Sequence, residues 1–206
     1  MTKPPAKFFY MMRHGETVAN REGYAAGSFD TPLTENGRKQ ALAARSVVGT
    51  LRPSPAIIVH SNLSRAKDTA KIVNETLRLP MLERDAIAEQ CFGDWMGQPW
   101  PYIHDRIVAG ETPPNGESMA MLTARVMAGL DEILALPKEP ILIVAHGGTF
   151  DALLWFFGCR INDVKNCHLY GFTPIAAATG FPWEIWHHEA SEDGTPTRSR
   201  VTVSPL

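Results

Sequence analysis

The chain has 206 residues, of which 44% are apolar and 20% are charged, and 20 basic against 22 acidic residues give it a formal net charge of −2. This composition is typical of a soluble globular protein, and the length predicts a single domain over residues 1–206. The near-neutral charge excludes a protein that wraps nucleic acid through bulk charge, although it allows a local basic pocket.

Neither a membrane span nor a secretion signal is expected. No run reaches the roughly 18 apolar residues that a span needs, and the apolar run at 8–12 is too short for the core of a signal peptide. The three cysteines, Cys91, Cys159 and Cys167, form no CxxC pair and suit free thiols in a reducing compartment. We therefore expect a cytoplasmic protein without membrane or nucleic-acid partners. The sequence does not specify its oligomeric state.

Short apolar runs alternate with amphipathic segments along the chain. Buried strands are predicted at 8–12, 56–60 and 141–145. Helical periodicity and capping residues predict helices at 34–51, 64–79, 102–109, 117–136 and 149–157. Between them lie an extended piece at 81–89, a structured loop at 90–101 and a β-prone segment at 168–188. Residues from about 189 to 206 are polar with little periodicity, which predicts a loose C-terminal tail.

This alternation predicts a three-layer α/β/α sandwich with a mostly parallel central sheet. Ligands of such sheets bind beyond the carboxyl ends of the strands. Arg13 and His14 follow the first expected strand, Arg65 follows the second by one helical turn, and His146 follows the third. We therefore expect two arginines and two imidazoles to meet at one edge of the sheet.

Such a cluster favours a phosphate monoester as its ligand. Guanidinium groups match phosphate oxygens, and the amides of Gly15 and Gly147 lack a side chain that would obstruct an anion. Neutral imidazole is a good nucleophile near neutral pH, so one histidine could form a phosphohistidine while the arginines stabilise the equatorial oxygens.

The leaving alkoxide needs a proton from a nearby carboxyl group. Glu89 is the best candidate and Glu16 is its nearest rival. His60 ends the second expected strand and is either a pocket residue or a structural strand end. We expect no metal and no cofactor, because the histidines show neither HxH nor HExxH spacing and the arginines would repel a cation.

Several sequence blocks resemble one known family. The signature RHGET at 13–17 is followed by DTPLTENG at 30–37, SNLSRAKDTA at 61–70, EQCFGDWMG at 89–97, PPNGES at 113–118 and AHGG at 145–148. Together they resemble the histidine phosphatase superfamily, in its phosphoglycerate-mutase-like branch, over about residues 7–172.

The resemblance implies a role for each matching residue. His14 would be the phosphorylated nucleophile, and Glu89 would protonate the leaving group and then activate water. The phosphoryl group would be held by Arg13, Arg65 and His146, with Asn20 and the Gly147 amide assisting. The expected function is that of a metal-independent phosphomonoesterase acting on a small phosphorylated metabolite. The alternatives are a phosphoglycerate-type mutase and a non-catalytic phosphate-binding module.

Two departures from the family pattern bear on the substrate. Met96 stands where the family often has Glu, and the segment 98–112 is short, with Arg106 as its only basic residue. A mutase must exclude water and retain its bisphosphate intermediate, so this short segment favours hydrolysis.

The aromatic residues near this segment leave two interpretations open. Either they line a specificity pocket or they pack beneath the loops: Phe29, Trp95, Trp100 and Tyr102. The sequence does not name the alcohol that carries the phosphate.

Overall fold

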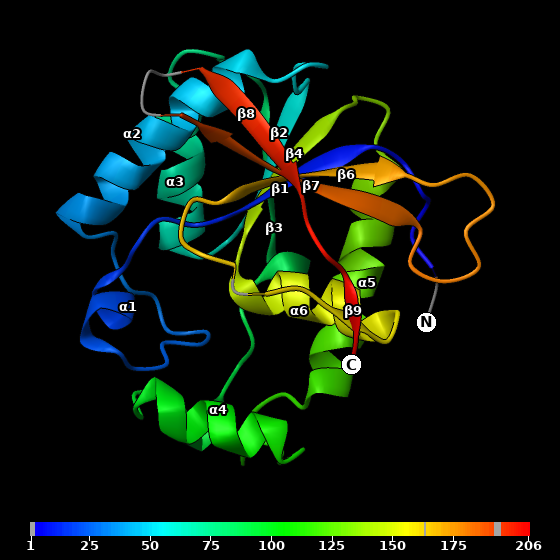
Figure 1. The fold of residues 1–206 in the computed structure, drawn as a ribbon. Helices are drawn as coiled ribbons and strands as arrows, with labels where there is room; N and C mark the ends of the chain where they lie inside the picture. The colour runs from blue at the N-terminus through cyan, green and yellow to red at the C-terminus, as the bar shows by residue number, and fades with distance from the viewer. Residues whose placement is uncertain (1–2, 163, 192–194) are drawn as a thin grey trace.

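Seven strands form one twisted sheet in the order β3–β2–β4–β1–β6–β7–β8 (Figure 1). The bounds come from a computed structural model that describes residues 3–162, 164–191 and 195–206. The strands of this sheet are β1 (Phe9–Arg13), β2 (Ile57–Ser61), β3 (Met81–Arg84), β4 (Ile141–Ala145), β6 (Leu169–Pro174), β7 (Trp183–Ala190) and β8 (Pro196–Arg200). A separate two-stranded sheet joins β5 (Cys159–Arg160) to β9 (Ser204–Pro205).

Helices cover both faces of the large sheet (Figure 1). They are α1 (Val18–Glu22), α2 (Glu35–Thr50), α3 (Ser64–Asn74), α4 (Trp100–Val108), α5 (Met119–Leu134) and α6 (Gly147–Phe156), with 3-10 turns at Asp85–Ile87 and Gly93–Trp95. Strands β3, β2, β4 and β1 pair in parallel, and β6, β7 and β8 extend the sheet with antiparallel pairs. The predicted fold class, a three-layer sandwich with a mostly parallel central sheet, is confirmed.

The alternation of side chains along β1 divides the core into two halves. Phe9 and Met11 pack in the cluster that contains the buried faces of α5 and α6. Tyr10 and Met12 point to the opposite face and pack in the cluster with residues of α2 and α3. Because all four side chains are fully buried, the strand has no polar face, as is typical of a parallel sheet covered on both sides.

Local hydrogen bonds decide where the helices begin and end. The Thr34 hydroxyl accepts from the Gly37 amide at 2.9 Å and caps α2, as the sequence predicted. Helix α3 stops at Asn74, short of the predicted end at 79, because the Asn74 side chain bonds both the amide and the carbonyl of Leu79, at 2.8 and 2.9 Å. Within the described ranges, no helix combines the length and apolarity needed to cross a membrane.

The prediction of a loose tail over 189–206 is wrong for its described residues. Strand β8 pairs antiparallel with β7, β9 pairs with β5, and the Arg198 guanidinium lies 4.7 Å from the centre of the Trp186 ring. All residues of β8 are exposed, so backbone pairing holds this strand without an apolar pattern in its sequence. Residues 192–194 of the predicted tail lie outside the described residues.

Close backbone packing between α2 and the segment after β1 generates a stability prediction. A Cβ atom at Gly37 would lie 2.0 Å from the Glu16 carbonyl oxygen, which neither backbone can accommodate without moving. We expect Gly37→Ala to lower the free energy of unfolding by about 1–3 kcal/mol, measured by urea denaturation. Gly49 lies in the same helix with nothing within 4 Å of such a Cβ, so Gly49→Ala should raise it by about 0.5–1 kcal/mol. Equal effects of the two substitutions would contradict this packing argument.

Candidate active site

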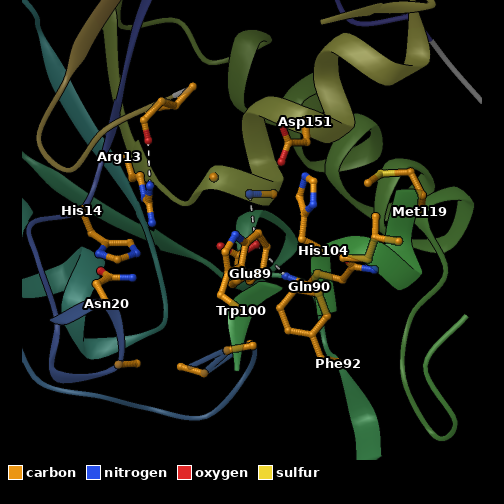
Figure 2. A pocket seen from close by; sticks show the side chains of 18 of the residues that line it. Arg13, His14, Asn20, Glu89, Gln90, Phe92, Trp100, His104, Met119 and Asp151 are labelled. Carbon is orange, nitrogen blue, oxygen red and sulfur yellow. Dashed lines mark hydrogen bonds between the residues drawn. The ribbon is translucent and has the colours of Figure 1, made fainter. Parts of the chain in front are cut away.

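A cavity of about 660 Å³ lies beyond the carboxyl ends of β1 and β4. Figure 2 shows side chains that line it. Of the predicted site residues, it is lined by Arg13, His14, Asn20, Arg65, Glu89 and Gly147. His146 lies behind this lining with no exposed surface, and its ring centre is 5.1 Å from that of His14. The structure therefore brings together side chains from segments more than 130 residues apart in the sequence.

The His14 imidazole is buried and oriented by the backbone. Its Nδ1 lies 2.8 Å from the carbonyl oxygen of Gly15, and because a carbonyl only accepts, Nδ1 carries the proton. Nε2 therefore presents a lone pair. Burial, reinforced by the charges of Arg65 and Arg13, holds the pKa of His14 well below its ordinary value of 6.5, so the ring is neutral at physiological pH.

The two arginines place positive charge at the cavity without a carboxylate bound to either. The Arg65 guanidinium donates to the carbonyl oxygens of Phe29 and Gly27, at 2.9 and 2.7 Å, and Arg13 donates to that of Val164 at 2.7 Å. Among the described residues, neither guanidinium forms an ion pair. Because carbonyl oxygens carry only partial charge, the arrangement remains suited to an anion.

His146 adds unused hydrogen-bonding capacity beside His14. Neither of its buried ring nitrogens has a partner among the residues that the structure describes. Burial and the charge of Arg65 hold the pKa of this imidazole well below its ordinary value. A buried polar group without a partner costs free energy, which a bound ligand oxygen would recover. Gly147 begins helix α6 directly after this residue, and amides in the first turn of a helix favour an anion.

Only one of the two candidate acids reaches the cavity. Glu89 Oε1 accepts from the amides of Gln90 and Gly148, at 2.9 and 3.1 Å. In Figure 2, Glu89 lies in the cavity lining between Arg13 and His104. The Glu16 carboxylate instead accepts from Thr34 Oγ1 at 2.6 Å and from a neighbouring side-chain amide, outside the cavity lining. The geometry thus separates Glu89 from its rival.

Arg125 of α5 holds the segment that carries Glu89, and no motif in the sequence indicates this role. Its guanidinium donates to the carbonyls of Ala88 and Glu89, at 3.0 and 3.3 Å, and binds the Glu117 carboxylate through two nitrogens at 2.8 and 2.7 Å. Glu117 also accepts from the Cys91 amide at 2.9 Å. The contacts of Arg125 and Glu117 therefore hold the backbone before and after Glu89, the residue whose carboxyl group faces the cavity.

The side-chain amide of Asn20 and the backbone amide of Gly15 differ in whether they can donate to a bound ligand. Asn20 Oδ1 accepts from the Thr17 amide and from Asn166 Nδ2, both at 3.2 Å, so Asn20 Nδ2 is available as a donor at the cavity. The Gly15 amide was expected to approach the anion, but it donates to Thr69 Oγ1 at 3.0 Å and lies outside the cavity lining.

The remaining sequence predictions divide between the cavity and the core. His60 is buried outside the lining, and its Nδ1 donates to the Ser61 carbonyl, so it is a structural strand end. Of the four aromatic residues left open, only Trp100 lines the cavity. Sequence reasoning missed other lining residues, among them His104, Met119, Asp151, Trp155 and Leu206. No cluster within the described ranges has three or more His, Cys, Asp or Glu side chains placed to hold a metal ion.

Known proteins share this sequence and this fold. The uncharacterized phosphatase PhoE of Bacillus subtilis is 41% identical over 145 residues, which cover 70% of this chain and 74% of that protein. The glucosyl-3-phosphoglycerate phosphatase of Mycobacterium tuberculosis is 34% identical over 166 residues, covering 72% and 74%. A solved structure of a mycobacterial glucosyl-3-phosphoglycerate phosphatase with VO3 superimposes with a TM-score of 0.69 at 28% identity, covering 87% of this chain and 97% of the other.

A family model covers most of the chain. The model described as the histidine phosphatase superfamily (branch 1) matches residues 9–177, from the first strand through the end of β6. This match includes every residue that the sequence analysis placed at the site. It confirms the resemblance seen in the sequence blocks: the chain belongs to the histidine phosphatase superfamily, branch 1.

Proposed function

We propose that the protein is a metal-independent phosphomonoesterase that hydrolyses a small phosphorylated metabolite through a phosphohistidine on His14. The observation that carries this proposal is a neutral, buried imidazole beside two guanidinium groups that form no ion pair with a described residue, with a carboxyl group in the same cavity. Relatives named as phosphatases support hydrolysis as the reaction.

In the first step, His14 Nε2 attacks phosphorus and the bond from phosphorus to the alcohol oxygen breaks. The electron pair of that bond leaves on the oxygen, which takes a proton from Glu89. Arg13 and Arg65 stabilise the charge on the equatorial oxygens, and Asn20 Nδ2 and the Gly147 amide are further donors. His146, as a neutral imidazole, contributes one N–H to the same oxygens.

In the second step, the Glu89 carboxylate takes a proton from water as the water oxygen attacks phosphorus. The N–P bond breaks, its electron pair returns to Nε2, and inorganic phosphate leaves. Each group therefore regains its starting protonation state. No step needs a metal ion, because the arginines supply the positive charge.

Segment 98–112, which follows the loop that carries Glu89, favours hydrolysis over the mutase alternative. Arg106, its only basic residue, pairs with Glu111 and lies 4.5 Å from the centre of the Tyr102 ring, outside the cavity lining. The cavity thus lacks a basic cover from this segment to retain a bisphosphate intermediate.

The nucleophile prediction uses p-nitrophenyl phosphate with EDTA present. We expect the wild type to hydrolyse it and His14→Ala to lose activity by roughly a thousandfold or more, because no other group replaces the imidazole. His60→Ala is the matched control, since His60 shares the buried strand-end position and the bond to the following carbonyl but lies outside the cavity. Loss of wild-type activity with EDTA, or full activity in His14→Ala, would overturn the proposal.

The role of Glu89 predicts a dependence on the leaving group. A phenolate with a nitro group needs little protonation, whereas an alkoxide needs a full proton transfer. We expect Glu89→Gln to slow benzyl phosphate by about 100-fold or more and p-nitrophenyl phosphate by much less, measured as kcat. Glu16→Gln should slow neither ester selectively, because Glu16 lies outside the cavity. Equal slowing of both esters by Glu89→Gln would exclude Glu89 as the acid.

The buried neutral histidines predict a pH dependence of stability. The folded state keeps the pKa of His14 and His146 well below 6.5, so below that pH the unfolded state binds protons that the folded state does not. The free energy of unfolding should therefore fall with pH below about 6.5, by up to about 1.4 kcal/mol per pH unit for each histidine. Denaturation in phosphate-free buffer should show a shallower slope for His14→Asn. An unchanged slope would show that His14 titrates normally.

A further inference from the structure

The cavity is larger than a phosphoryl group requires, and its far wall differs in chemistry from its phosphate end. At about 660 Å³, its volume is in the range of sites that hold a whole small molecule. Figure 2 shows Arg13, His14 and Asn20 together, and Phe92, His104 and Met119 on the other side of Glu89. The acid thus stands where an ester oxygen would join a phosphoryl group to an alcohol.

We propose that this far wall binds the alcohol part of the substrate and selects an uncharged alcohol with an apolar or aromatic ring over a short anionic alcohol such as phosphoglycerate. This inference rests on the proposed phosphatase function and concerns only the leaving group.

One face of α4 supplies an apolar wall to the cavity. Trp100, His104, Ile107 and Val108 line it, at the spacing of a single helix face. Trp100 is 46% exposed and Val108 is 72% exposed, so the protein itself does not cover them. The core contact of this helix is made by Ile103, which is fully buried in a cluster with Phe92 and Trp95. Ile107 also packs partly against this cluster, whereas Trp100 and Val108 leave much of their apolar surface exposed, and exposed apolar surface of this kind marks a binding site.

Other elements extend the apolar wall. Met119 at the start of α5, Leu154 and Trp155 in α6, and Leu206 beside β9 also line the cavity. Trp155 and Leu206 are 40% and 63% exposed. The indoles of Trp100 and Trp155 provide two flat surfaces suited to a ring.

The charges in the cavity disfavour an anionic alcohol. The basic lining residues are Arg13 and Arg65 at the phosphate end and the exposed Arg160 of β5, and the acidic ones are Glu89 and Asp151. In a phosphoglycerate the carboxylate lies within a few bonds of the ester oxygen. Glu89 becomes a carboxylate as it protonates that oxygen, so its negative charge would develop close to the substrate carboxylate, and like charges there oppose turnover.

The test compares esters whose leaving groups are all aliphatic alkoxides, so that the demand for protonation is similar. We expect kcat/KM for benzyl phosphate to exceed that for 3-phosphoglycerate by at least about tenfold, with glycerol 3-phosphate between them. Trp100→Ala should lower kcat/KM for benzyl phosphate by about tenfold and change that for glycerol 3-phosphate by less than about twofold. Tyr102→Ala is the matched control, because Tyr102 is an exposed aromatic residue of the same helix outside the cavity lining.

A second variant covers the case in which Trp100→Ala destabilises the protein. Val108 is highly exposed, so Val108→Arg should fold normally and place a cation on the wall. We expect it to raise the ratio of kcat/KM for 3-phosphoglycerate to that for benzyl phosphate by about fivefold or more. Preference of the wild type for 3-phosphoglycerate, or an equal loss for all esters in Trp100→Ala, would overturn this inference while leaving the phosphatase proposal intact. Absence of turnover with every ester, p-nitrophenyl phosphate included, would overturn both.

Discussion

The active-site region depends on a buried guanidinium whose charge is neutralised by no bound carboxylate of the described residues. Arg65 is 2% exposed, and the carbonyl oxygens of Phe29 and Gly27 accept its hydrogen bonds. These bonds fix the guanidinium while leaving most of its charge available. The same charge adds to the burial that keeps the His14 imidazole neutral. One arrangement therefore provides both an attraction for a phosphate dianion and an unprotonated imidazole, two features that a neutralised arginine would not provide together.

The parallel pairing of β1 with β4 explains why the two histidines meet. Arg13 is paired with Ala145 at the ends of these strands, and the His14 amide donates to the Ala145 carbonyl at 3.0 Å. The next residue on each strand is a histidine, so the register brings the two imidazoles side by side. A shift of one residue would turn His14 to the other face of the sheet. The burial of both faces of β1 opposes such a shift, because every side chain of that strand except Arg13 is fully buried.

The parts of the structure with a strong apolar period were predictable from the sequence, and so was the edge of the sheet where the site lies. The pairing of strands that lack an apolar period was not predictable from the sequence. Strand β8 is exposed along its whole length, so nothing in its composition distinguishes it from a tail. The choice between Glu16 and Glu89 and the contact of Arg125 with the Glu89 segment depend on how distant segments fold together. Trp100 and Tyr102 are equally aromatic in the sequence, and only the orientation of α4 separates a cavity residue from a surface residue.

The two ends of the cavity rest largely on different supports, which allows substrate choice to change without disturbing the proposed chemistry. His14, the proposed nucleophile, and His146 follow strands in the centre of the sheet, where the core fixes their positions. Much of the apolar wall is carried by α4, which packs on a small separate cluster through Ile103, while α6 contributes Leu154 and Trp155. Between these parts, the Arg125–Glu117 pair fixes the segment of Glu89 independently of α4. A substitution of the exposed Val108 should therefore act on the alcohol alone, since neither the proposed phosphate contacts nor the proposed acid depends on that side chain.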